Sequence, residues 1–154
     1  MDTRFNIGNF RVYIGVKRMT WVDGVNSKLD DGGHFLMWDF DDVDPEELSL
    51  ALEETQKALG LPNIYILSSG KPRGYHAYCF KRYSWDEAFA IVWRTPRVCQ
   101  TFVKMAFVRG YFTLRYSAKS GREISFERIL VGPAPEDVDP RQIHNFVRYY
   151  TKGG

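Results

Sequence analysis

The sequence predicts an α+β fold with a mainly antiparallel sheet flanked by helices. Short alternating or β-branched segments, typical of strands, are interleaved with segments that carry helix start and stop signals. Strand pairs and helices mixed along one chain favour this class. The 154 residues, with 44% hydrophobic and 26% charged side chains, indicate one globular domain over residues 1–154.

The first elements are strands. Residues 10–16 alternate in polarity and are β-branched, which predicts a strand. Turn signals follow at 23–24 and 30–33. Residues 34–41 are apolar and aromatic, and they predict a buried strand that ends in carboxylates.

A helix is expected next, capped by Asp44, with a proline and two glutamates in its first turn. Gly60 ends it. Strands at 63–67 and 75–80 then flank a loop at 68–74. The remaining predicted elements are a helix from the capping box at 84–87 to about 93, a helix at 98–109, strands at 111–118 and 124–131 joined by a turn at 119–122, and a last helix at about 139–150.

Charge is unevenly distributed along the chain, although the net charge is only +2. Residues 1–70 carry 6 basic and 12 acidic side chains, whereas residues 71–122 carry 11 basic and 2 acidic ones. This asymmetry suits a protein that holds metal ions beside a polyanion. Two solvated surfaces of opposite sign would explain it equally well.

Targeting signals and cysteine patterns are uninformative here. No apolar run reaches the roughly 20 residues of a membrane helix, and the polar N-terminus does not resemble a signal peptide. We therefore expect a cytoplasmic protein that makes no membrane contact. Cys79 and Cys99 form no zinc pattern and are expected to be reduced thiols.

Asp39 and Asp41 are the first candidate site residues. They lie two apart on a strand, so both side chains project from one face, about 7 Å apart. Two such carboxylates repel each other unless a cation offsets them, and Mg²⁺ prefers carboxylates together with substrate phosphates. The other interpretation is a strand that ends in an acidic turn.

The second candidate is the loop from Ser69 to His76. Its small residues let backbone amides approach an anion, and Lys71 and Arg73 add positive charge. The residues that follow predict a strand, so this is not a Walker A loop. A polar hairpin with a structural histidine would look similar.

Arg115 is the third candidate, in the middle of a predicted strand between large apolar residues. Such an arginine needs a carboxylate or phosphate partner. Asp39 or Asp41 as partner would make it structural, whereas a nucleotide phosphate would make it functional.

These segments together resemble the archaeo-eukaryotic primase superfamily. That family has an apolar strand ending in Asp-x-Asp/Glu, then Ser-Gly-basic-Gly-x-His, and later an arginine-bearing strand. Here they correspond to 37–41, 69–76 and 111–119, within a motif-bearing core of about 34–122. The loop is one residue longer than the common form because of Pro72.

The resemblance implies an RRM-like palm that acts as a template-dependent nucleotidyltransferase, that is, a minimal primase–polymerase. Asp39 and Asp41 would hold two Mg²⁺ or Mn²⁺ ions. Ser69, Lys71, Arg73 and His76 would contact the incoming nucleoside triphosphate, and Arg115 and Lys119 would bind phosphate or template. The implied partners are single-stranded DNA template or primer–template, with a helicase or accessory replication subunit in trans. A compact form of this kind suits a mobile genetic element.

One departure from the family pattern concerns its third acid. The corresponding position holds Cys99, and the acids between 76 and 122 are Asp86 and Glu87, both expected in a helix first turn. A catalytically weak or inactive primase-fold protein that binds nucleotide or single-stranded nucleic acid is therefore an alternative. A plain RRM-like nucleic-acid-binding module is another.

Overall fold

The computed structural model describes residues 2–16 and 18–152, and it confirms the α+β class with antiparallel sheets. The elements of the body are β3 (Met19–Asn26), β4 (His34–Phe40), α1 (Pro45–Leu59), β5 (Ile64–Ser68), β6 (Tyr75–Tyr83), α2 (Trp85–Arg94), α3 (Gln100–Arg109), β7 (Thr113–Arg115), β8 (Ser125–Leu130), a short 3-10 turn (Pro140–Gln142) and β9 (Phe146–Lys152). They are preceded by a hairpin of β1 (Asp2–Ile7) and β2 (Phe10–Gly15).

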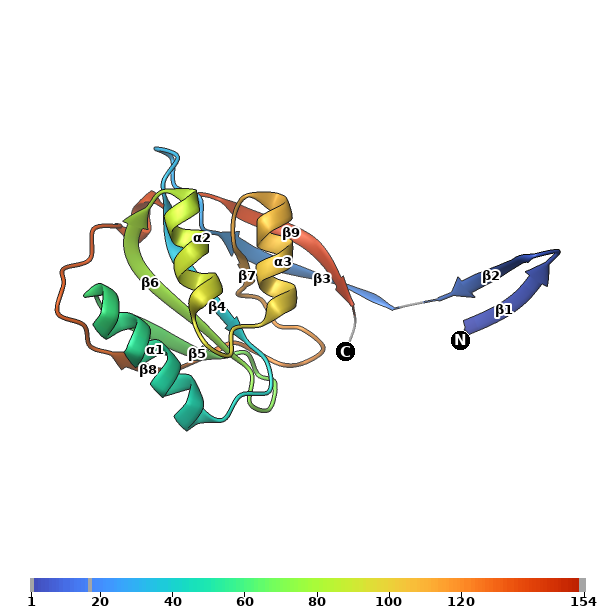
Figure 1. The fold of residues 1–154 in the computed structure, drawn as a ribbon, viewed down its shortest axis with the longest axis horizontal. Helices are drawn as coiled ribbons and strands as arrows, with labels where there is room; N and C mark the ends of the chain where they lie inside the picture. Colours follow the sequence, from blue (N-terminus) through green and yellow to red (C-terminus); the bar gives the residue numbers. More distant parts are fainter. Residues whose placement is uncertain (1, 17, 153–154) are drawn as a thin grey trace.

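Two sheets make up the body. The four-stranded sheet has the order β4-β6-β5-β8, and the three-stranded sheet has the order β7-β3-β9. The helices lie on one side of the strands, with α2 over β4 and β6 (Figure 1).

The core lies between the helices and β4. Trp38, Phe35, Phe40 and Phe112 are fully buried. The indole Nε1–H of Trp38 donates to Oγ1 of Thr95 at 2.9 Å, which satisfies the one polar group of this large side chain. Thr95 follows the last residue of α2, so this bond joins the middle of β4 to the end of that helix.

The predicted helix ends are largely confirmed. α2 begins with the capping box, in which Ser84 accepts from the Glu87 N–H and the Glu87 side chain accepts from the Ser84 N–H. α1 ends at Gly60, whose φ of 60° is left-handed. Asp44 occupies the N-cap of α1, but its side chain makes no capping hydrogen bond. Arg73 lies 3.3 Å from that carboxylate instead.

The predicted helix at 139–150 is wrong. The Asp-Pro signal starts only the 3-10 turn at 140–142, and residues 146–152 form strand β9 along β3. Valine and aromatic residues in this segment favour a strand, and β3 offers them a partner that no local signal reveals.

The turn predicted at 23–24 is also absent, because these residues lie within strand β3. There, a Cβ on Gly24 would lie 2.8 Å from the Leu114 carbonyl oxygen, so only glycine fits.

The predicted hairpin of strands 111–118 and 124–131 is also wrong. β7 pairs with β3, and β8 pairs with β5, so these strands belong to different sheets. The segment between them contains one isolated bridge, Lys119 to Arg122, at the expected turn.

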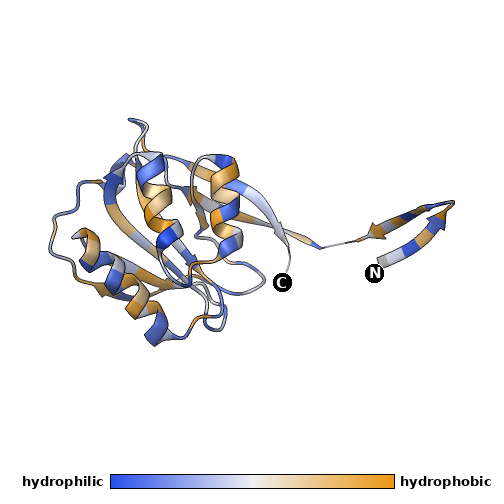
Figure 2. Ribbon diagram, viewed as in Figure 1, coloured by the Kyte–Doolittle hydropathy of each residue, from blue (hydrophilic) through white to orange (hydrophobic). Residues whose placement is uncertain are grey.

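The hairpin of β1 and β2 extends away from the body (Figure 1). The strand predicted at 10–16 is its second half. Cross-strand pairs Phe5–Val12 and Ile7–Phe10 share one face. Apolar and polar bands alternate along both strands (Figure 2).

Among the described helices, none is long and apolar enough to cross a membrane.

Candidate metal and polyanion pocket

Two neighbouring strands bring a carboxylate beside an imidazole. Asp39 on β4 and His76 on β6 are directly opposed in the antiparallel register, so their side chains leave the same face. Nε2 of His76 lies 3.6 Å from Oδ1 of Asp39, and the histidine side chain is only 6% exposed. The side chain of His76 is therefore directed at the first carboxylate of the Asp-x-Asp pair.

A thiol joins the two carboxylates at the end of β4. Cys99 immediately precedes α3, and its backbone N–H donates to the carbonyl oxygen of Asp39 at 2.7 Å. One donor atom from each of Asp39, Asp41 and Cys99 lies within 4.8 Å of the others. Two hard oxygen ligands and one softer sulfur in this space fit a single divalent cation.

The electrostatics of the pocket separate the two carboxylates. Burial, together with the charge on Asp41, raises the pKa of Asp39 to about 7. Burial also acts to raise the pKa of Asp41, but the hydrogen bond and charge of Lys71 outweigh it, and the pKa of Asp41 is lowered. A cation between the two side chains would favour the ionised form of both.

His76 is neutral in this environment. Burial, and then the charge on Arg115, lowers the pKa of His76 to about 4. Its 3.6 Å contact with Asp39 is therefore not an ion pair at neutral pH, although the geometry would allow one. A neutral imidazole keeps one N–H donor for a ligand.

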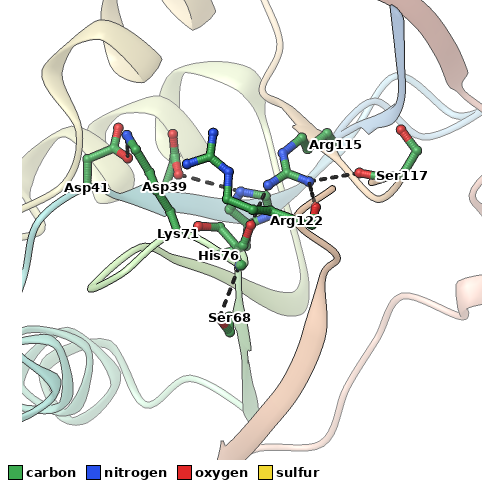
Figure 3. A network of polar contacts seen from close by, with 10 residues as sticks. Asp39, Asp41, Ser68, Lys71, His76, Arg115, Ser117 and Arg122 are labelled. Atoms are coloured by element: carbon green, nitrogen blue, oxygen red, sulfur yellow. Dashed lines mark hydrogen bonds and ion pairs between the residues drawn. The ribbon is translucent and has the colours of Figure 1, made fainter. Parts of the chain in front are cut away.

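The loop between β5 and β6 forms the next wall of the pocket. It is closed by two 3.0 Å bonds, from the Ser69 N–H to the Gly74 carbonyl and from the Gly74 N–H to the Lys71 carbonyl. A Cβ on Gly74 would collide with Oγ of Ser69 and lie 2.9 Å from Cβ of Lys71. Nζ of Lys71 lies 3.0 Å from Oδ1 of Asp41. Figure 3 shows the two side chains turned toward each other.

Among the described residues, Arg115 forms no ion pair with Asp39 or Asp41. Its guanidinium donates to the carbonyl oxygen of Ser117 at 2.8 Å, a contact drawn in Figure 3. It also donates to the carbonyl oxygen of Ser69. Carbonyl oxygens fix the orientation of the guanidinium without neutralising its charge. Arg115 can therefore attract an anion into the pocket.

These side chains enclose one pocket of about 210 Å³. This volume is many times what a single water needs, so a polar group such as a phosphate can enter the pocket. Its lining residues are Asp39, Asp41, Ser69, Lys71, His76, Thr113, Leu114, Arg115, Lys119, Arg122, Tyr149 and Thr151. Arg73 is not among them, because it faces Asp42 and Asp44 at 3.4 and 3.3 Å.

Five of the lining residues were missed by the sequence analysis: Thr113, Leu114, Arg122, Tyr149 and Thr151. The last two lie on β9, where Oγ1 of Thr151 accepts from Nζ of Lys119 at 3.0 Å. Their spacing of two residues is typical of a strand face and could have identified them. The helix signal at 139–140 obscured it.

The described residues contain two buried side-chain polar atoms without a hydrogen-bond partner. They are Nδ1 of His76 and Oγ1 of Thr113, and both residues line this pocket. Buried polar groups are normally paired, so two unpaired ones beside one pocket mark it as an unusual place in the fold.

The chain matches no protein-family model, no curated protein and no solved structure. The function is therefore inferred from the side chains of the pocket and its surroundings.

An apolar groove of about 470 Å³ occupies the same sheet face. Tyr78 lies two residues beyond His76 on β6, and Leu67 on β5 is paired with His76, so both leave the face that bears the pocket. The other aromatic residues that line it are Phe35, Tyr65, Phe80, Tyr116, Phe126 and Phe146. A ligand with charged and flat apolar parts could use the pocket and the groove together.

Proposed function

We propose that the protein is a template-dependent nucleotidyltransferase with an RRM-like palm, acting as a minimal primase–polymerase. One observation carries the proposal: a single pocket joins a carboxylate pair to four basic side chains, Lys71, Arg115, Lys119 and Arg122. A site with carboxylates alone would repel a nucleic acid. A site that binds phosphate through basic residues alone would have no need of carboxylates. A metal–triphosphate complex needs both.

The roles follow from position. Asp39 and Asp41 would hold the metal, with Cys99 next to them. Bound there, a metal ion lowers the pKa of an attacking hydroxyl and stabilises the leaving pyrophosphate. The neutral His76 donates a hydrogen bond to a phosphate oxygen, and the guanidinium of Arg115 offsets charge that develops on the transferred phosphoryl group.

The aromatic groove favours a nucleotide or a single strand over bare polyphosphate. Aromatic faces stack with any base, and a basic pocket beside them attracts the backbone. We place the template or primer strand along this face. The exposed fraction of Phe126, 61%, leaves its ring available for such contacts.

The test is incorporation of nucleotides on single-stranded or primed DNA with Mg²⁺ or Mn²⁺. Asp39→Asn is expected to reduce incorporation by about 10²-fold or more, since it removes a charge from the reacting centre. Asp42→Asn is the matched control, because the Asp42 side chain is 87% exposed and lies outside the pocket. A wild-type chain that incorporates nothing with either ion contradicts the proposal.

The second candidate function is metal-dependent triphosphate binding without incorporation. Cys99 favours it, because it stands where a third carboxylate would complete the metal site. This candidate predicts triphosphate binding that chelator abolishes and incorporation that appears in Cys99→Asp. Binding of single strands that resists chelator would instead indicate a plain RRM-like module.

A further inference from the structure

Cys99 occupies a helix position for which its side chain is poorly suited. It is the N-cap residue of α3, and its side chain makes no capping hydrogen bond. Serine, threonine, aspartate and asparagine stabilise that position because their oxygens accept from the first turn, whereas a thiol is a weak acceptor. Helix capping therefore does not explain a cysteine here.

The surroundings of Cys99 do offer an explanation. Its sulfur lies within 4.8 Å of carboxylate oxygens of Asp39 and Asp41. Within the described part of the chain, no hydrogen bond reaches the carboxylate of Asp39. The adjacent His76 side chain is 6% exposed, and its Nε2 faces that carboxylate at 3.6 Å, beyond hydrogen-bond distance. Buried polar groups normally have a partner, and a cation at the carboxylates would be one for Asp39.

We propose that Cys99 is a thiolate ligand of a divalent transition-metal ion held with Asp39 and Asp41, and that this site discriminates against Mg²⁺. Mg²⁺ is a hard ion that takes oxygen ligands in near-ideal octahedral geometry. A thiolate instead favours softer ions such as Zn²⁺, Co²⁺ or Cd²⁺. The use of this metal in phosphoryl transfer rests on the proposed function, but the donor set itself does not.

Cys79 serves as an internal control. It is the other cysteine of the sequence and is fully buried in β6. Because its thiol is enclosed in the core, added metal does not reach it in the folded chain. Any thiolate signal from the folded chain therefore reports on Cys99.

The experiment is a titration of the full chain with Cd²⁺ and with Co²⁺, followed by thiolate-to-metal charge-transfer absorption. The wild type and Cys79→Ala are expected to develop the band with one bound ion per chain. Cys99→Ser should lose it, while its melting temperature shows that it remains folded. In Cys99→Asp, excess Mg²⁺ is expected to displace Co²⁺ about tenfold or more easily than from the wild type.

A wild type without the band, or a band that persists in Cys99→Ser, overturns the inference. The two proposals fail separately. A band in a chain that incorporates no nucleotide leaves the thiolate site standing and removes the polymerase. If the chain incorporates nucleotides as rapidly with Mg²⁺ as with Mn²⁺ and shows no band, the polymerase stands and the thiolate site is removed.

Discussion

Replacing Asp39 by asparagine should make the metal-free protein more stable at alkaline pH. Asparagine has nearly the same size as aspartate and cannot ionise. In the folded chain the pKa of Asp39 is raised from 3.8 to about 7 by burial and by the charge on Asp41. The folded state thus holds the proton more tightly than the unfolded state does, and ionisation favours unfolding.

The sign and size of the effect follow from linkage. The stability tied to the protonated carboxyl is fully present below pH 3.8 and is lost as the pH rises to about 7. At about 1.4 kcal/mol for each pKa unit, the loss reaches about 4 kcal/mol above pH 7. His76 acts in the opposite direction, because its lowered pKa gives stability that disappears as the pH falls from 6.5 toward about 4. At pH 8 His76 is neutral in the folded and the unfolded state of both chains, so it adds nothing to the comparison at that pH.

Urea unfolding in the presence of chelator measures this difference. We expect Asp39→Asn to exceed the wild type by up to about 4 kcal/mol at pH 8 and by less than about 1 kcal/mol at pH 4. Asp42→Asn, exposed and outside the pocket, should change stability by no more than about 0.5 kcal/mol at either pH. An equal difference at both pH values, or a less stable Asp39→Asn at pH 8, would refute the reasoning.

Three further substitutions test other parts of the structure. Ser27→Ala leaves the buried Phe112 N–H without its 3.0 Å acceptor, and urea unfolding should show a loss of about 1–3 kcal/mol. Gly74→Ala forces the loop at 69–74 open, so calorimetry should show weaker triphosphate binding with little change in melting temperature. Arg122→Met should weaken triphosphate binding by about tenfold or more, whereas Arg128→Met, outside the pocket beside α1, should not. Equal losses in both arginine variants would contradict a role for the pocket.

Local signals predicted the segment from β4 to α2 well. Its helix ends depend on residues such as Pro45, Gly60 and the Ser84–Glu87 box, which act within one turn. The same segment holds Asp39 and His76, so their chemistry was accessible from the sequence. Their direct opposition across two strands, however, comes from the register, which the sequence analysis did not predict.

Non-local pairing accounts for most of the errors. β9 is a strand because β3 lies beside it, and β3 was missed because its glycine and aspartate are typical of turns. The pocket wall that contains Tyr149 and Thr151 was lost with that strand. Arg115 was correctly singled out as an arginine in need of partners, but the partners found are carbonyl oxygens, which no sequence pattern specifies.

Because Asp39 and His76 face each other across β4 and β6, the pocket depends on the exact register of these two strands. β4 and β6 already contain a register shift between His34 and Leu36, so one residue more or less in that bulge changes every pair beyond it. A slip by one position would set Asp39 opposite Ala77 or Tyr75. Such a slip would also turn Trp38 and Phe40, now fully buried, toward the other face of the sheet. Insertions or deletions in this bulge should therefore remove the ligand site and destabilise the fold together.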